Sequence, residues 1–126
     1  MNLKKDITTF ADIQCLVNAF YDKVRQDELV APIFNQAIQS QWPEHLEKMH
    51  RFWETVLMKH YTYSGVPFPP HAKLPVQHIH FEKWLALFTE TTDAHFEGAK
   101  TEEAKWRAGK MAMMFESKIN YIPQHP

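Results

Sequence analysis

Apolar side chains recur at steps of three and four residues near the start of the chain. At about 100° of rotation per residue, positions with this spacing fall on one face of an α-helix. The stripe consists of Phe10, Ile13, Leu16, Val17, Phe20, Tyr21 and Val24. Thr8 or Thr9 can cap the start of this amphipathic helix, or pair of helices in phase. Pro32 limits its continuation and begins a short aromatic segment that ends at Phe34.

A second helix is expected to begin near Ser40, because Pro43 is tolerated in the first turn of a helix. Its apolar stripe consists of Met49, Phe52, Trp53, Val56 and Leu57. His45 extends the same stripe. His50 lies about 140° around the helix from His45, so we expect it at the surface.

Two more helical patterns follow the Pro-rich segment Val66–Pro75. The first has its apolar face at Phe81, Trp84, Leu85, Phe88, Thr92 and Phe96. Gly98 suits the end of that helix, and Thr101 suits the N-cap of the next one. The last stripe consists of Ala104, Ala108, Met111, Phe115 and Ile119. Since no segment alternates with a period of two, we predict an all-α fold with one Pro-rich crossover and packing of bundle or globin type.

Length and composition narrow the possible classes of protein. A chain of 126 residues makes one domain, residues 1–126. The lone Cys15 allows no internal disulfide, and the charged N-terminus does not resemble a signal peptide, so we expect a soluble cytoplasmic protein without a membrane span. The 14 Lys and Arg nearly balance the 15 Asp and Glu, which argues against a nucleic-acid partner. With only 3 Gly, the chain has no phosphate-binding loop.

The candidate chemistry starts with His71, which follows two prolines in a segment too short for another core helix. An imidazole restrained in this way is a good ligand for haem iron, although a lone His in a loop is usually a solvated side chain. His45 and Met49 lie one turn apart on an apolar face, which fits either a ligand site or the mouth of a core that reaches water. Tyr21 and Trp84 bring donors to an apolar interior, either for a ligand or for partners within the core.

Together these features resemble the group III truncated haemoglobins. The resemblance runs from about Phe10 to Tyr121, and low glycine content is consistent with it. Its most specific segments are AFYDKVRQDELVAPIFNQAI, EHLEKMHRFWETVL, GVPFPPHAKLP and FEKWLALF. The resemblance implies a truncated globin fold, a two-over-two helical sandwich around a haem.

The resemblance also implies a role for each candidate residue. His71 is the implied proximal ligand of the iron in haem b (iron protoporphyrin IX). Tyr21 and Trp84 are implied distal hydrogen-bond donors, and His45 is the implied distal gate. The implied ring contacts are Phe34, Met49, Phe52 and Phe81. Met49 replaces the branched aliphatic residue often found there, and its flexible thioether could alter ligand access.

The function implied is reversible binding of dioxygen, carbon monoxide, nitric oxide or similar small ligands at a five-coordinate iron. Polar donors in a dry pocket stabilise bound dioxygen, so release should be slow. Slow release favours sensing, detoxification or redox chemistry over oxygen transport, and peroxidase-like activity is an alternative. An unidentified reductase would keep the iron ferrous.

Two further classes of function remain open at this stage. His78 and His80 could join His71 in binding zinc, which would make the chain a non-haem metal-binding helical protein. Two residues apart on a helix, however, His78 and His80 point roughly 160° apart and form a poor chelate. Trp106 lies off its helix's apolar stripe and could mark the surface of a helical interaction module, although single exposed aromatics are usually incidental.

Overall fold

Helices account for all of the regular structure in the part of the chain that the structure describes. This computed structural model describes residues 3–63, 65 and 74–121. Its helices are α1 (Phe10–Gln26), α2 (Ala31–Ile38), α3 (Trp42–Met58), α4 (His78–His95) and α5 (Ala99–Tyr121). Within those ranges there is no strand, so the predicted all-α class is confirmed.

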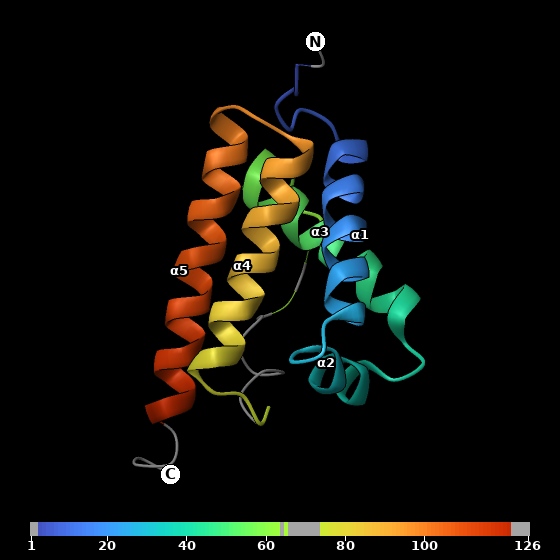
Figure 1. Ribbon diagram of the computed structural model, residues 1–126. Coiled ribbons are helices and arrows are strands. Elements are labelled where there is room, and N and C mark those ends of the chain that lie inside the picture. Colours follow the sequence, from blue (N-terminus) through green and yellow to red (C-terminus); the bar gives the residue numbers. More distant parts are fainter. Residues whose placement is uncertain (1–2, 64, 66–73, 122–126) are drawn as a thin grey trace.

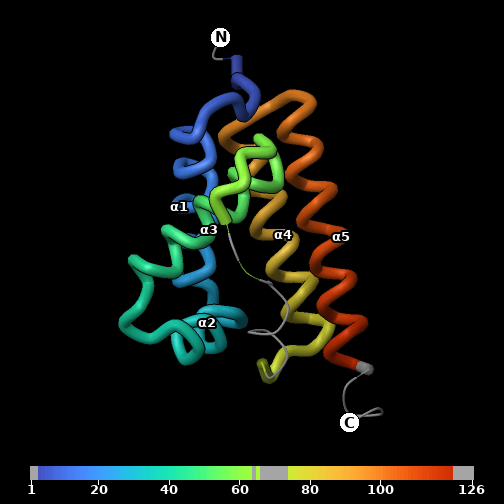
Figure 2. The backbone as a smooth tube through the Cα atoms, turned by 180° about the vertical axis from the view of Figure 1, so that it is seen from behind, coloured from blue at the N-terminus to red at the C-terminus, as the bar shows by residue number. Residues whose placement is uncertain are grey.

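The four long helices form two layers of two. One layer pairs α1 with α3, and the other pairs α4 with α5, which run antiparallel (Figure 1). The layers meet where α1 packs on α4 and α3 packs on α5. The helix α3 lies behind α1 and α4 in Figure 1 and in front of them in Figure 2. The short helix α2 packs on α1, at the end of the molecule away from the first described residues.

Local signals explain the starts of the first three helices. Thr9 is the N-cap of α1: its hydroxyl accepts from the backbone N–H of Asp12, while the Asp12 carboxylate accepts from the backbone N–H of Thr9 in return. Pro43 lies in the first turn of α3, as predicted. Pro32 was predicted only to begin an aromatic segment, but it lies in the first turn of α2, where a missing N–H costs no hydrogen bond.

The turn between α4 and α5 is built around Gly98 and Asp6. Gly98 has φ 141°, a conformation that favours glycine. The prediction that Thr101 is an N-cap was wrong, because α5 begins at Ala99 and Thr101 is buried within its first turn. The Asp6 carboxylate caps α5 instead: Oδ2 accepts from the backbone N–H of Lys100 at 2.9 Å, and Oδ1 accepts from the backbone N–H of Thr101 at 2.9 Å. The cap therefore comes from the start of the chain.

Aromatic side chains join the two layers in the core. Phe88 of α4 stacks on Trp53 of α3 with ring centroids 5.0 Å apart, and it meets Phe20 of α1 edge-on at 5.3 Å. The largest fully buried side chains include Ile13, Leu16, Val17, Phe20, Val24, Leu57 and Phe88. Their positions follow the predicted stripes, whereas Trp106, which lies off its stripe, is exposed, as is Cys15.

His50 was expected at the surface, and that prediction was wrong. Its side chain is only 8% exposed, and its Nε2 lies 2.8 Å from Oδ1 of Asn18 on α1, to which it donates a hydrogen bond. Burial lowers the pKa of His50, while nearby Glu47 acts in the opposite direction. A single apolar stripe predicts one buried face for α3, but α3 packs on both α1 and α5, so a second face is covered as well.

Candidate functional site

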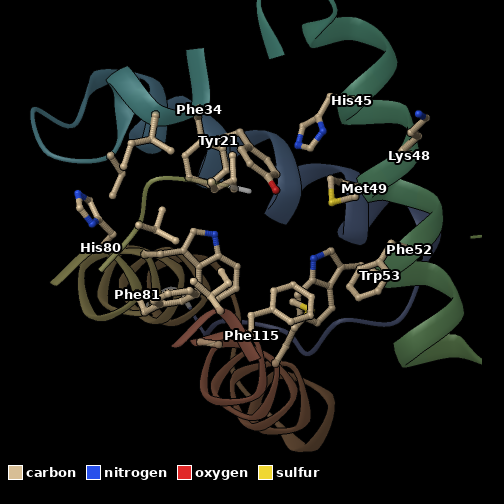
Figure 3. A pocket seen from close by; sticks show the side chains of 18 of the residues that line it. Tyr21, Phe34, His45, Lys48, Met49, Phe52, Trp53, His80, Phe81 and Phe115 are labelled. Atoms are coloured by element: carbon tan, nitrogen blue, oxygen red, sulfur yellow. The ribbon is translucent and has the colours of Figure 1, made fainter. Parts of the chain in front are cut away.

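An apolar cavity lies between the two layers, closed at one side by α2 (Figure 3). Its volume is about 250 Å³. Because a single water needs roughly 10–15 Å³ by the same measure, this space is far larger than a packing defect. Its lining consists of Tyr21, Val30, Ile33, Phe34, His45, Lys48, Met49, Phe52, Trp53, Tyr63, Leu74, Val76, His80, Phe81, Trp84, Met111, Ala112, Phe115 and Ile119.

The candidate site residues that lie in the described ranges gather around this one cavity. Tyr21 comes from α1 and His45 from α3, and both belong to the lining, as does Trp84 of α4. The residues expected to contact a ring, which also line the cavity, are Phe34, Met49, Phe52 and Phe81. His71 lies outside the described residues. The structure thus brings the expected distal residues and ring contacts together, while what they bind stays a prediction.

Tyr21 provides a hydroxyl group deep in the cavity. Figure 3 shows its oxygen pointing into the cavity, and the residue is buried. Phe20 holds its ring edge-on with centroids 4.8 Å apart, and Phe34 does so at 6.1 Å. Burial raises the pKa of the phenol because the charged form would lose its hydration. Tyr21 therefore keeps its proton near neutral pH and can donate a hydrogen bond.

His45 places an imidazole beside this phenol. The two rings meet edge-on, with centroids 5.1 Å apart and planes at 86°. Both side chains point into the same part of the cavity in Figure 3. Met49, one turn further along α3, continues the wall on the same side. A small polar molecule in this part of the cavity would meet a hydroxyl, an imidazole and a thioether.

Two polar residues of the lining were not predicted. Lys48 lies three residues after His45 on α3 and is exposed, so it belongs to the rim of the cavity. His80 lies at another edge of the cavity in Figure 3, and its Nδ1 accepts a hydrogen bond from the backbone N–H of Gln77 at 2.9 Å. The sequence could have indicated Lys48, because it lies three residues after His45 on the same helix. For His80, the direction of the side chain depends on where α4 begins, at His78, and the sequence did not give that start.

The described residues give no support to a zinc site. His78 turns towards α5, where its Nδ1 lies 2.9 Å from a carboxylate oxygen of Glu116, while His80 lines the cavity. Across the ranges that the structure describes, no three His, Cys, Asp or Glu side chains are arranged to hold a metal ion. The third proposed nitrogen, from His71, is not among those residues.

Tyr63 is another lining residue without a strong sequence signal, and α3 fixes its position. The hydroxyl of Thr55 accepts from the backbone N–H groups of Thr62 and Tyr63, at 3.2 and 3.0 Å. The buried carboxylate of Glu54 accepts from the Thr62 hydroxyl at 2.6 Å. The Tyr63 ring then meets Phe52 edge-on, with centroids 5.4 Å apart. The segment that leaves α3 is therefore tied to the cavity wall.

Comparison with known proteins identifies the family. The sequence model of the bacterial-like globins matches residues 5–117. The chain is a bacterial-like globin. The group 3 truncated haemoglobin ctb of Campylobacter jejuni is 34% identical over 108 residues, which cover 82% of this chain and 85% of that protein. This globin therefore belongs to the group III truncated haemoglobins, as the sequence motifs suggested.

A solved structure agrees with this assignment. The crystal structure of group III truncated haemoglobin from Campylobacter jejuni superposes with a TM-score of 0.85 and 32% sequence identity, covering 93% of this chain and 95% of that one. The predicted truncated globin fold is thus confirmed, and the protein is a globin-type haem-binding protein. None of the helices in the described ranges combines the length and apolar character needed to cross a membrane.

Proposed function

We propose that this globin holds haem b in the cavity and binds dioxygen, carbon monoxide, nitric oxide or similar small ligands beside Tyr21 and His45. The observation that carries the proposal is the chemistry of the lining. A protonated phenol and an imidazole face a space whose other walls are mainly aromatic and aliphatic. The Tyr21 hydroxyl is buried and faces this space, and a polar group that converges on a mainly apolar cavity favours a ligand there.

The lining fits a flat, largely apolar macrocycle. Phe34, Phe52 and Phe81 come from α2, α3 and α4, so rings face the cavity from several directions. Lys48 at the rim can pair with a carboxylate of haem where that carboxylate meets solvent. When bound, haem supplies an iron atom with a coordination position open to small ligands.

We assign His71 as the residue that would hold the haem iron, as the sequence motif implies. Tyr63 and Leu74, the lining residues on either side of the crossover, both support this assignment. Leu74 is three positions after His71, and an extended chain spans at most about 10 Å over three positions. A histidine at this position is therefore within reach of the cavity.

The proposed distal residues have two different roles, stabilisation of the ligand and control of ligand access to the cavity. With haem bound, the Tyr21 hydroxyl would donate a hydrogen bond to a small ligand in the cavity, and the Trp84 indole N–H is assigned the same role. His45 is assigned control of access from the α3 side. Strong hydrogen-bond donors slow ligand release, which favours sensing, detoxification or redox chemistry over transport. A reductase is the partner that would keep the iron ferrous.

Absorption spectra of the purified protein test this proposal. We expect haem bands in the ferric and ferrous forms and a shifted band when carbon monoxide is added to the ferrous form. His71→Ala should abolish stable haem retention or change the axial ligand. His95→Ala is the matched control, because His95 is exposed at the end of α4, and it should leave the spectra unchanged. Equal loss in both variants, or a wild-type protein without haem bands after reconstitution, would contradict the proposal.

A further inference from the structure

Trp42 contacts the side chains of Tyr21 and His45 without lining the cavity itself. It is the first residue of α3 and is 6% exposed. Its ring meets that of His45 edge-on, with centroids 5.7 Å apart and planes at 90°. It also meets Tyr21, with centroids 5.8 Å apart. One buried indole thus contacts both the phenol and the imidazole that line this part of the cavity.

Contacts from the other elements fix Trp42 in this position. Its Nε1 donates a hydrogen bond to Oδ1 of Asn35 on α2 at 3.2 Å. The guanidinium of Arg25, near the end of α1, lies 4.5 Å from the centre of the indole ring, at a distance typical of a cation–π contact. Residues from α1 and α2 therefore anchor a side chain of α3, and its orientation does not depend on α3 alone.

The consequence concerns the orientation of His45. Residues three apart are neighbours on a helix surface, so Trp42 and His45 lie next to each other on α3. The imidazole contacts both Trp42 and Tyr21, which also contact each other, so the three rings form one cluster. If Trp42 were absent, the space behind the imidazole would open, and the ring could turn away from the cavity.

We propose that Trp42 is a positioning residue that holds His45 towards the cavity and so restricts ligand access past it. The inference rests on the proposed function, because it concerns access to the same site. Asn35 contributes to the same restriction through its hydrogen bond to the indole. Trp42 acts through His45 and is not assigned a contact with the ligand.

The rate of carbon monoxide association after flash photolysis tests the proposal on the haem-loaded protein. Trp42→Leu should speed association about two- to tenfold, the change that corresponds to losing one aromatic pair. Asn35→Ala should act in the same direction with a smaller effect, because it removes the hydrogen bond that holds the indole but retains the Trp42 side chain. It therefore also serves as the test if Trp42→Leu folds poorly. Trp106→Leu is the matched control, since Trp106 is 57% exposed on α5, and its rate should equal that of the wild type.

A double-mutant cycle separates positioning from a general loosening of the cavity. In a His45→Leu background, Trp42→Leu should add no further acceleration, because the side chain that it positions is gone. An equal acceleration in both backgrounds would overturn the proposal. So would an unchanged or slower rate when His45 is present.

Histidine C2–H exchange with deuterium, followed by mass spectrometry, provides a readout that needs no ligand. His45 should exchange more slowly than exposed His95 in the wild type and approach the His95 rate in Trp42→Leu. An unchanged His45 rate in the variant would overturn the positioning role. A wild-type protein without haem bands would instead contradict the proposed function, so the two failures are distinguishable.

Discussion

The cap of α5 and the cavity use polar side chains in opposite ways. At the cap, Asp6 accepts hydrogen bonds from the backbone N–H groups of Ile7, Lys100 and Thr101 and from the Thr101 hydroxyl. In the cavity, the hydroxyl of Tyr21 points into open space between aromatic walls, with His45 beside it. The cap satisfies its polar groups within the protein, whereas the Tyr21 hydroxyl faces the cavity, where the proposed ligand would meet it.

This difference separates stability from ligand binding. Groups with internal partners hold distant parts of the chain together, so replacing them should lower stability. A donor that faces a cavity contributes less to the stability of the fold and more to the binding of a molecule in the cavity. Substitutions in the two regions should therefore change different measurements, and each prediction below tests that division.

The largest stability effect is expected at Gly98. A Cβ atom there would lie 2.5 Å from Cγ of Asp6, and the positive φ of 141° also strains any residue with a side chain. Gly98→Ala should destabilise the protein by about 2–4 kcal/mol, from backbone strain and from displacement of the Asp6 carboxylate. Thermal or denaturant unfolding measures this loss.

Gly109→Ala is the matched control for that prediction. Gly109 lies within α5, and a Cβ atom there would meet nothing within 4 Å. The substitution should raise stability by roughly 0.5–1 kcal/mol because it reduces the freedom of the unfolded chain. Similar destabilisation by both substitutions would show that the close contact with Asp6 does not decide the outcome.

A smaller effect is expected from the charge on Asp6. Burial would raise the pKa of its carboxyl, but the hydrogen bonds from Lys100, Thr101 and Ile7 together hold the pKa below its usual value. The folded state then binds fewer protons than the unfolded state. The contribution of Asp6 is therefore present above the ordinary carboxyl pKa of about 4 and lost as the pH falls below it.

Comparison of the wild type with Asp6→Asn across pH tests this sign. At pH 7 the variant should be less stable by about 1–2 kcal/mol, because an amide replaces a charged acceptor. The difference should shrink as the pH falls below about 4, because the carboxylate of the unfolded chain takes up its proton there and that of the folded protein follows only at lower pH. A stability difference that stays constant between neutral and acidic pH would contradict the assignment.

Periodicity and turn chemistry predicted the long helices and most of the cavity wall. The stripes placed Tyr21, Met49 and Trp84 on inward faces because each helix repeats every 3.6 residues. The family resemblance, which rests on sequence motifs, then predicted the other residues of the site. Residues close together in sequence are sufficient for predictions of this kind.

Features that depend on distant contacts could not be predicted in this way. Asp6 caps α5 from the start of the chain, so local rules assigned the cap to Thr101 instead. His50 is buried because α3 packs on α1 as well as on α5, which one helical stripe does not reveal. The contacts of Trp42 likewise join α1, α2 and α3, and only the folded arrangement brings them together.

The rate of dioxygen release from Tyr21→Phe tests the central claim most directly. Stopped-flow dissociation from the reduced, haem-loaded protein should be about 10 to 100 times faster in this variant than in the wild type, because a charge-assisted hydrogen bond contributes roughly 1.5–3 kcal/mol. Asp6→Asn should leave the release rate unchanged, since its effect belongs to the cap. Unchanged release in Tyr21→Phe, or equal acceleration in Asp6→Asn, would contradict the claim that the cavity donors act on the ligand.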